Sequence, residues 1–334
     1  MGQVVPTCHR VLYNWQVGTT CPTDWTLQIE PSNLTQTIES HHGSQSQVTG
    51  IGMRFLGATM EGVRSEVVLL GVPFDGTASY RAGARFGPEA IRSASYSLET
   101  FSPFIDRDLE GMQYSDWGDL EVPAGSAARV VELVRARVRD IYKSGAKPFV
   151  LGGEHTITLG AVQAAFEKYP NLSVLQLDAH TDLREEYLGD RLSHATVMRR
   201  IMDFVPAERI YRFGVRAGTR EELIGSGLDL PLGFEGGQRD IEKTIGHIPL
   251  DVPLYVTIDL DVFDPSLMPG VGNPEPLGIT YREFIQIVRI LSQRNMVGCD
   301  VMELAPHFDQ TGVSAVVAAS VVRETLICLG GMPD

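Results

Sequence analysis

The stretch LDAHTD at residues 177–182 decides how the rest of this 334-residue chain is interpreted. It ends an apolar run at residues 172–177, whose length and branched side chains predict a buried strand. Two other predicted strands end in the same way, one in GGEH at residues 152–155 and the other in DLD at residues 259–261. Open parallel sheets bind ligands beyond the carboxyl ends of their strands, so we expect the three segments to meet in one crevice.

Predicted strands and helices alternate along the chain from residue 65 onward. Strand-length apolar runs occupy residues 66–71, 148–151, 172–177, 209–214, 253–260 and 296–302. Helical patterns occupy residues 127–141, 281–291 and 313–327. A further helix is expected to begin at Gly87-Pro88, because proline is favoured in a first helical turn. This alternation predicts an α/β fold, a single domain with three layers, α-β-α, around a mostly parallel sheet.

The first 52 residues differ in composition from the rest. Residues 35–52 are rich in Ser, Gln, Thr, His and Gly, so they would bury too little apolar surface to offset chain entropy. We expect residues 1–52 to form an extension that is disordered or loosely packed, and residues 53–334 to form the domain that carries the three segments. The extension is either an addition to a chain that naturally starts at Met53, or a genuine but dispensable segment.

The chain is acidic, with 42 Asp and Glu against 28 Lys and Arg and a formal charge of −14. A nucleic-acid partner would need a basic face, so none is expected. The charge suits a cationic substrate, although many proteins are acidic for solubility alone. Four scattered cysteines without a Cys-x-x-Cys pair indicate a reducing compartment. The sequence has no run of about 18 apolar residues, so no membrane partner is expected. We therefore expect a cytoplasmic protein.

Carboxylate and imidazole side chains gather at the three predicted strand ends. The set is His155, Asp178, His180, Asp182, Asp259 and Asp261. Several of them lie two residues apart, so in extended segments they share one face. Carboxylates on a buried face repel one another unless cations neutralise them, which predicts two divalent cations with Asp178 and Asp259 as bridging ligands. Mostly oxygen donors with fewer imidazoles favour Mn²⁺ over zinc.

Each of these segments alone is weak support for a metal site. Asp-x-His and Asp-x-Asp arise by chance and often cap turns. The pair Glu154-His155 also begins like a zincin motif, but no second histidine follows at helical spacing. A phosphate-binding loop and a dinucleotide-binding fingerprint are missing as well. The metal prediction therefore depends on the three segments together.

Across roughly residues 65–327 the sequence resembles the ureohydrolases, the arginase and agmatinase superfamily. The resemblance rests on GGEH at residues 152–155, DAHTD at 178–182 and DLDVFDP at 259–265, continued by PGVG at 269–272. It implies the arginase/deacetylase-like fold and two Mn²⁺ per subunit. One ion would be held by His155, Asp178, Asp182 and Asp259, and the other by Asp178, His180, Asp259 and Asp261.

The resemblance also implies hydrolysis of a guanidino group to urea and an amine. Two bound cations would lower the pKa of water enough to give hydroxide at neutral pH. Asp182 resembles the residue that both binds metal and relays a proton, and His194 resembles a histidine that assists proton transfer. Glu303 resembles the carboxylate that holds the guanidinium. The alternatives are a helix-capping surface histidine at 194 and an ordinary buried salt bridge at 303.

The substrate is expected to be agmatine, cleaved to putrescine and urea. LREEYLGD at residues 183–190 lacks the Asn and small hydroxyl residues that arginases typically place there, and resembles agmatinases, as do FDGT at 74–77 and YRAGARFGP at 80–88. An acidic loop suits an ammonium tail. Arg184 could receive a carboxylate, so guanidinobutyrase or another amidinohydrolase is the alternative, followed by a non-catalytic polyamine- or metal-binding relative. Homo-trimers or homo-hexamers are common in the family, and the resemblance implies the same here.

Overall fold

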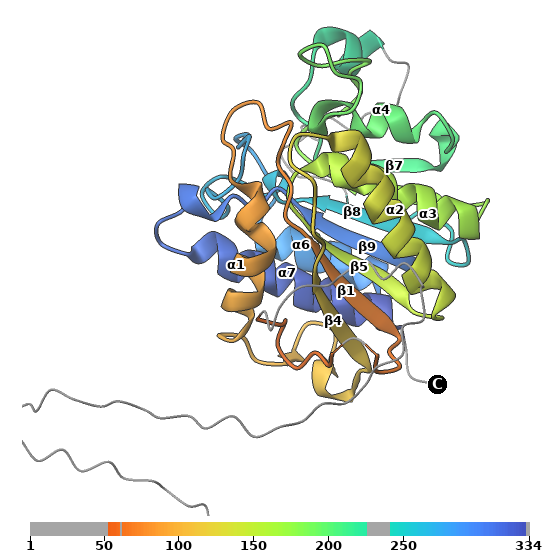
Figure 1. Ribbon diagram of the computed structural model, residues 1–334, viewed down its shortest axis with the longest axis vertical. Helices are drawn as coiled ribbons and strands as arrows, with labels where there is room; N and C mark the ends of the chain where they lie inside the picture. The colour runs from red at the N-terminus through yellow and green to blue at the C-terminus, as the bar shows by residue number, and fades with distance from the viewer. Residues whose placement is uncertain (1–52, 61, 226–240, 332–334) are drawn as a thin grey trace, which may run out of the picture. The chain divides into compact units, whose positions relative to one another are not determined.

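The computed structural model describes residues 53–60, 62–225 and 241–331 (Figure 1). The predicted N-terminal extension, residues 1–52, lies outside these residues, so its boundary and its packing stay predictions. The described residues include all six predicted metal ligands, as well as His194 and Glu303.

A seven-stranded sheet forms the centre of the described chain. In spatial order its strands are β4 (Tyr114–Asp119), β1 (Val67–Val72), β5 (Lys147–Gly152), β9 (Met296–Met302), β8 (Leu254–Asp259), β6 (Ser173–Leu177) and β7 (Ile210–Phe213). Every neighbouring pair is parallel. Every residue of β1, β6, β8 and β9 is buried, as expected for a parallel sheet that is covered on both faces.

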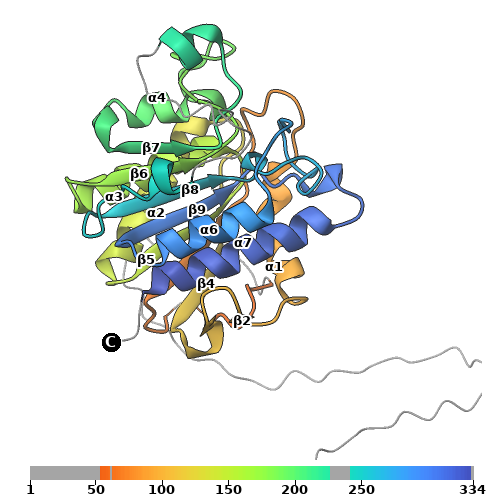
Figure 2. The ribbon, with the colours of Figure 1, turned by 180° about the vertical axis from the view of Figure 1, so that it is seen from behind.

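Helices cover both faces of this sheet. One face carries α1 (Gly87–Ser95), α5 (Ile241–Ile245), α6 (Tyr281–Leu291) and α7 (Val313–Gly330), of which α6 and α7 lie in front in Figure 2. The other face carries α2 (Ala127–Lys143), α3 (Thr158–Lys168) and α4 (Val197–Ile201), seen in Figure 1. Two large groups of buried apolar side chains and a small third one fill the space between the sheet and these helical layers. The predicted α/β fold with three layers is confirmed.

The edge strand β4 and the two-stranded antiparallel pair β2 (Phe101–Ser102) and β3 (Arg107–Asp108) did not follow from the sequence. β4 reads YSDWGD, which lacks the apolar run of a buried strand. Its Asp116 carboxylate accepts two hydrogen bonds from the buried Arg92 guanidinium, at 2.7 and 2.9 Å. Arg92 also donates to Asp119, at 2.5 Å. A strand that carries paired charges in place of apolar side chains lacks the hydrophobic pattern from which strands are predicted.

Helix α7 is long and apolar enough to cross a membrane by length and composition alone. In the fold, however, 67% of its residues are buried. The apolar run is interrupted by Arg323 and Glu324, which are buried and form an ion pair at 2.5 Å. The apolar character of α7 therefore follows from its packing in the core.

Candidate metal centre and substrate pocket

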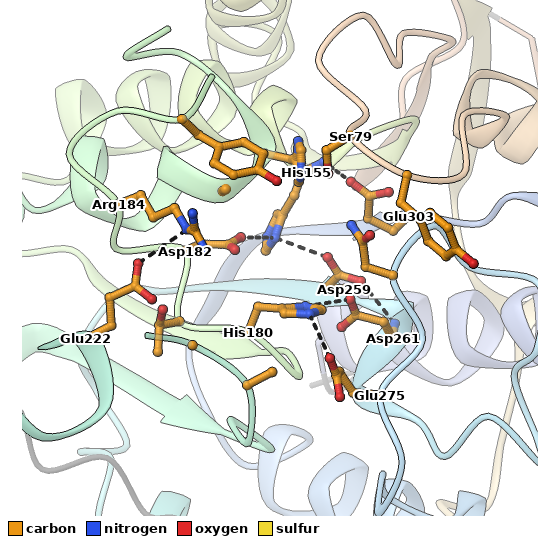
Figure 3. A pocket seen from close by; sticks show the side chains of 18 of the residues that line it. Ser79, His155, His180, Asp182, Arg184, Glu222, Asp259, Asp261, Glu275 and Glu303 are labelled. Carbon is orange, nitrogen blue, oxygen red and sulfur yellow. Dashed lines mark hydrogen bonds and ion pairs between the residues drawn. The ribbon is translucent and has the colours of Figure 1, made fainter. Parts of the chain in front are cut away.

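The carboxyl ends of four neighbouring strands bring the predicted site residues together (Figure 3). His155 begins a short 3₁₀ turn, His155–Ile157, directly after β5, and Asp178 follows β6. Asp259 is the last residue of β8, and Glu303 follows β9. Because these strands are parallel, their carboxyl ends lie at the same edge of the sheet. The predicted convergence of the motifs in one place is confirmed.

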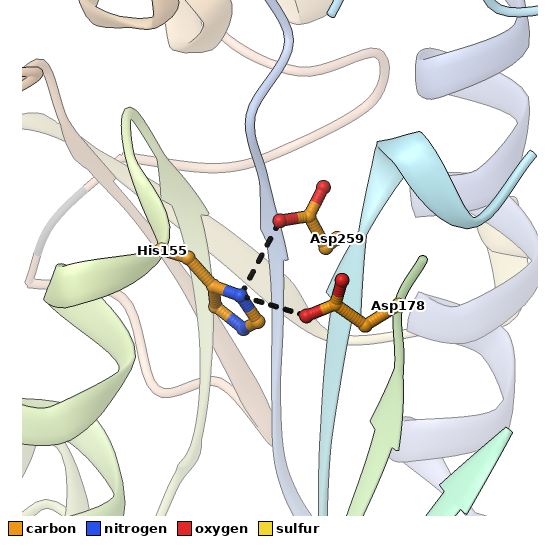
Figure 4. A group of neighbouring side chains, drawn as sticks. All are labelled: His155, Asp178 and Asp259. Carbon is orange, nitrogen blue, oxygen red and sulfur yellow. Dashed lines mark ion pairs between the residues drawn. The ribbon is translucent and has the colours of Figure 1, made fainter. Parts of the chain in front are cut away.

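The first group of potential metal ligands surrounds one nitrogen of His155. Its Nδ1 atom lies 3.2 Å from Asp178 Oδ2, 3.0 Å from Asp182 Oδ2 and 3.3 Å from Asp259 Oδ2. Figure 4 shows His155, Asp178 and Asp259 pointing toward a common centre. All these side chains are buried. Nδ1 nevertheless has no hydrogen-bond partner of good geometry, which is the arrangement expected of donor atoms that share a cation.

The second group lies around His180. Its Nδ1 atom is 2.9 Å from Asp261 Oδ2 and 3.7 Å from Asp178 Oδ1. Asp178 thus turns one oxygen to each histidine, as expected of a bridging carboxylate. Asp259 groups with His155 and Asp178, and its Oδ1 accepts a hydrogen bond from the Asp261 amide at 3.0 Å. The bridging role expected for Asp259 stays a prediction.

The electrostatics of the site favour cations. Burial raises the pKa of Asp259 well above its usual value, and the charges of Asp261 and Asp178 raise it further. Burial and the charge of Asp178 raise the pKa of Asp182 to about 7. Burial lowers the pKa of His155, but the surrounding carboxylates outweigh it and hold this pKa well above the usual value. Without metal ions, bound protons have to offset the negative charges of these carboxylates. Bound divalent cations would neutralise the same charges in place of the protons.

A pocket of about 570 Å³ opens above the two groups. The residues that line it include His155, His180, Asp182, Asp259, Asp261, Glu303 and His194. Its remaining lining includes Ser79, Tyr80, Arg81, Arg184, Tyr187, Glu222, Asn273 and Glu275. A space of this volume accommodates a small organic molecule.

Comparison with known proteins agrees with the geometry. Residues 65–328 match the sequence model of the Arginase family, which covers more than half of the chain. The chain belongs to the arginase family. It is therefore a ureohydrolase, a hydrolase of guanidino compounds, and its His and Asp groups imply the binuclear metal site of that family.

Several arginase-family relatives are similar over most of their length. An agmatinase of Bacillus anthracis is 42% identical over 270 residues, which are 79% of this chain and 91% of that protein. An N(1)-aminopropylagmatine ureohydrolase of Thermococcus kodakarensis is 38% identical over 251 residues, 74% of this chain and 85% of that protein. The crystal structure of an agmatine ureohydrolase of Thermoplasma volcanium has a TM-score of 0.70 at 30% identity, covering 79% of this chain and 90% of that one.

In this ureohydrolase, Glu303 lines the pocket. Its Oε1 accepts a hydrogen bond from the His155 amide at 2.8 Å. Among the described residues it forms no ion pair with a lysine or arginine, so the salt-bridge alternative does not describe it. Burial raises its pKa to about 8, and the nearby Glu154 contributes to the rise. A buried carboxylate with this pKa is stabilised when a cation such as a guanidinium binds beside it.

His194 lies in the pocket wall and is not the surface histidine of the alternative interpretation. It is only 9% exposed, and its ring packs edge-on against Tyr187 with 5.7 Å between centroids. Its Nδ1 lies 3.3 Å from Thr77 Oγ1, and its Nε2 lies 3.2 Å from Ser79 Oγ. Burial, together with the charges of the site histidines, lowers its pKa to about 4. The ring is therefore neutral near pH 7.

Residues behind the ligands hold them in place, and the sequence did not single them out. Thr257 Oγ1 lies 2.8 Å from His155 Nε2, the ring nitrogen that points away from the carboxylates. Behind it, Asp300 is fully buried and accepts a hydrogen bond from Tyr255 at 2.9 Å. Such outer partners fix the ring orientation of a ligand histidine. Thr257 was detectable only as a polar residue two positions before Asp259 on the same face of β8.

Two site residues have left-handed backbone conformations, Asp182 with φ 53° and Glu303 with φ 70°. Such conformations cost non-glycine residues roughly 1–3 kcal/mol and are common at functional sites. They are supported by backbone hydrogen bonds, from Glu303 to Gly153 at 2.8 Å and from Arg199 to Asp182 at 3.1 Å. The strained backbone directs both carboxylates into the pocket (Figure 3).

Proposed function

We propose that this ureohydrolase is a Mn²⁺-dependent agmatinase, which cleaves agmatine to putrescine and urea. The observation that carries the proposal is the charge of the pocket. Glu303 stands beside the metal groups, and Glu222 and Glu275 line the pocket as well. Acidic groups at several places in one pocket suit a molecule with a guanidinium at one end and an ammonium at the other. The names of the similar proteins from Bacillus and Thermoplasma support the same substrate.

The donor set supports manganese as the metal. Each predicted ion would have mainly carboxylate oxygens and one imidazole nitrogen, with His155 in one group and His180 in the other. Hard oxygen donors with a minority of imidazole suit Mn²⁺, whereas structural zinc favours nitrogen and sulfur. When bound, the pair of cations supplies Lewis acidity and lowers the pKa of water toward neutrality.

The side chains of the pocket supply the rest of the chemistry. The Glu303 carboxylate would bind the planar guanidinium and orient its central carbon toward the metal groups. His194 would hold a proton at either ring nitrogen, because the Thr77 and Ser79 hydroxyls beside these atoms act as donors or acceptors. Asp182, which lines the same pocket, would deliver a proton to the leaving amine.

A panel of substrates tests the proposal. Protein that has been stripped of metal by a chelator is reloaded with Mn²⁺, Zn²⁺ or Mg²⁺, and urea release from agmatine, L-arginine and 4-guanidinobutyrate is measured. We expect the highest kcat/KM for agmatine with Mn²⁺, and equal amounts of urea and putrescine. Preference for arginine or 4-guanidinobutyrate would contradict the substrate, and higher activity with Zn²⁺ would contradict the metal. No urea from any of the three would favour the non-catalytic alternative.

We also propose a homo-trimer or homo-hexamer and a cytoplasmic location. The resemblance to the ureohydrolases supports the assembly, and the few scattered cysteines support a reducing compartment. Light scattering coupled to size-exclusion chromatography measures the mass in solution, and a mass equal to one chain would contradict the assembly.

A further inference from the structure

One ion pair in the pocket lining is not explained by the metal groups or by Glu303. Arg184 and Glu222 face each other across the pocket lining, with Arg184 Nε 3.8 Å from Glu222 Oε1 (Figure 3). Arg184 lies two residues after the predicted ligand Asp182, and Glu222 lies on a π-helical turn, Glu221–Gly225, after β7. The pair therefore joins segments that leave two neighbouring strands, β6 and β7.

Glu222 is held in place independently of Arg184. Its Oε2 accepts a hydrogen bond from the Thr219 amide at 2.6 Å, and its own amide donates to Thr219 Oγ1 at 3.2 Å. Its side chain is only 10% exposed. The carboxylate is thus a fixed negative charge in the pocket lining, with Oε1 directed at Arg184.

Arg184 is less restricted but is also occupied. Its guanidinium lies over the ring of Tyr187, with 4.7 Å to the centroid, and its side chain is 42% exposed. An anionic tail that approached Arg184 would meet the Glu222 charge beside it. A cationic tail would be attracted by Glu222 and, with Arg184 already neutralised, would not be strongly repelled. The pair therefore places a paired cation and a fixed carboxylate side by side in the pocket lining.

We propose that Glu222 is the specificity-determining residue for the substrate tail: by neutralising Arg184 it makes the pocket select a cationic tail over an anionic one. This inference rests on the proposed function, because it concerns the tail of the same guanidino substrate. Glu275 is a weaker candidate for the same task, since it is 41% exposed and its Oε1 lies 3.9 Å from His180 Nε2, beside the metal groups. A change at Glu275 would affect all substrates through His180.

The test compares kcat/KM for three guanidines of equal chain length: agmatine, 4-guanidinobutyrate and the neutral-tailed N-butylguanidine. In Glu222→Gln the ratio of agmatine to 4-guanidinobutyrate is expected to fall at least about tenfold, with agmatine slower and 4-guanidinobutyrate faster. N-butylguanidine should be cleaved as by the wild type, because it makes no charge contact with the pair. The matched control is Glu221→Gln, an exposed glutamate on the same turn, which should keep the wild-type ratio.

Arg184→Met provides a second arm that leaves Glu222 in place. It should lower kcat/KM for 4-guanidinobutyrate and keep or raise that for agmatine. In the double variant the gain of 4-guanidinobutyrate activity seen in Glu222→Gln should disappear, because that gain requires an unpaired Arg184. If Glu222→Gln does not fold, the Arg184→Met ratio alone decides, and a ratio equal to that of the wild type would overturn the inference.

The outcomes separate this inference from the proposed function. A wild-type enzyme that releases no urea from agmatine would overturn both. A wild-type enzyme that prefers agmatine, together with a Glu222→Gln variant of unchanged ratio, would overturn the inference alone. Equal losses for all three guanidines in Glu222→Gln would show a general structural role and would also overturn it.

Discussion

Asp178 is the residue on which both groups of potential metal ligands depend. It is fully buried, and its two oxygens face His155 and His180. Burial raises its pKa, but the two histidines outweigh this effect, so the pKa lies below the usual value. Its oxygens also accept hydrogen bonds from the His180 amide at 2.6 Å and from Gln176 at 2.8 Å. The carboxylate is thereby ionised and fixed before any cation arrives.

Replacing this carboxylate should remove the metal site as a whole. We expect Asp178→Ala to lose urea release and to bind less than one manganese per chain, because a shared ligand serves both ions. The loss of affinity should exceed the roughly 10- to 100-fold cost of losing an outer partner. Metal analysis after gel filtration measures it, with the exposed Asp251→Ala as the control. A variant that retains two manganese ions would contradict the bridging role.

Glu303 has a different task, and its replacement should separate metal binding from turnover. In Glu303→Gln we expect a normal manganese content and a kcat/KM roughly 10- to 100-fold lower, the value of one hydrogen bond to a charged group. Glu303→Ala should behave in the same direction with a larger loss. Metal content and kcat/KM for agmatine are measured on the same preparation. Loss of both ions in either variant would show that Glu303 supports the metal groups instead.

At the scale of elements, the strand ends and their loops create the site. Arg216 follows β7, and its guanidinium donates to backbone carbonyls of three segments. The acceptors are Gly214 at 3.0 Å, Asp261 at 2.8 Å, Val262 at 3.2 Å, Phe263 at 3.4 Å, Glu275 at 2.8 Å and Pro276 at 2.8 Å. One side chain thus ties the ligand loop after β8 to the pocket lining at Glu275.

A lysine cannot reproduce this planar set of donors. We expect Arg216→Lys to lower the free energy of unfolding by about 2–4 kcal/mol, the sum of several lost hydrogen bonds. Manganese affinity should also fall, because the loop that carries Asp261 loosens. Urea denaturation of the metal-loaded protein measures the first effect, with Arg289→Lys as the control, since Arg289 donates to the exposed Phe104 carbonyl at 3.4 Å. Unfolding and metal affinity equal to the wild type would contradict this role.

The sequence predicted the site better than it predicted the supports of the site. The motifs at 152–155, 178–182 and 259–261 were recognisable because strand and ligand residues are adjacent in the chain. Gly153 shows why the first motif needs glycine, since a Cβ there would lie 1.9 Å from the Phe74 carbonyl oxygen. Arg216 and Glu222 were not recognisable, because Arg184 beside Glu222 and most of the carbonyls that Arg216 contacts are distant in sequence. The contacts of such residues depend on the packing of loops, which leaves no periodic pattern.

The backbone of the site was equally hidden. A left-handed conformation is expected at glycine, yet Asp182 and Glu303 adopt it. Both are held by backbone hydrogen bonds to other segments, with the Glu303 amide donating to Gly153 and the Asp182 carbonyl accepting from Arg199, which a local pattern does not reveal. The edge strand β4 escaped for a related reason, because its aspartates are paired with Arg92 on α1.

At the scale of the whole molecule, metal binding and stability should be linked through pH. In the metal-free protein the pKa of Asp182 is raised to about 7 and that of Asp259 well above its usual value. A carboxyl group whose pKa is higher in the folded state than in the unfolded state favours folding at pH values below its usual pKa, near 4. This contribution is lost as the pH rises through the raised pKa of the folded state. The raised pKa values of His155 and His180 act in the same direction. Asp178 acts oppositely, but only in strong acid.

We therefore expect the metal-free protein to melt at a lower temperature at pH 8.5 than at pH 6. Manganese should raise the melting temperature more at pH 8.5, because it binds the deprotonated ligands and neutralises their repulsion. Thermal unfolding followed by circular dichroism, with and without Mn²⁺ at each pH, measures both effects. A manganese-induced shift that is larger at pH 6 would contradict the account.

The central claim is that side chains from separate strand ends enclose two metal ions. Anomalous diffraction from crystals grown with Mn²⁺, with data collected on both sides of the manganese absorption edge, tests it most directly. The account predicts two anomalous peaks, one contacted by His155, Asp178, Asp182 and Asp259 and the other by Asp178, His180, Asp259 and Asp261. A crystal of active enzyme with no peak among these residues, or with a single peak, would contradict it.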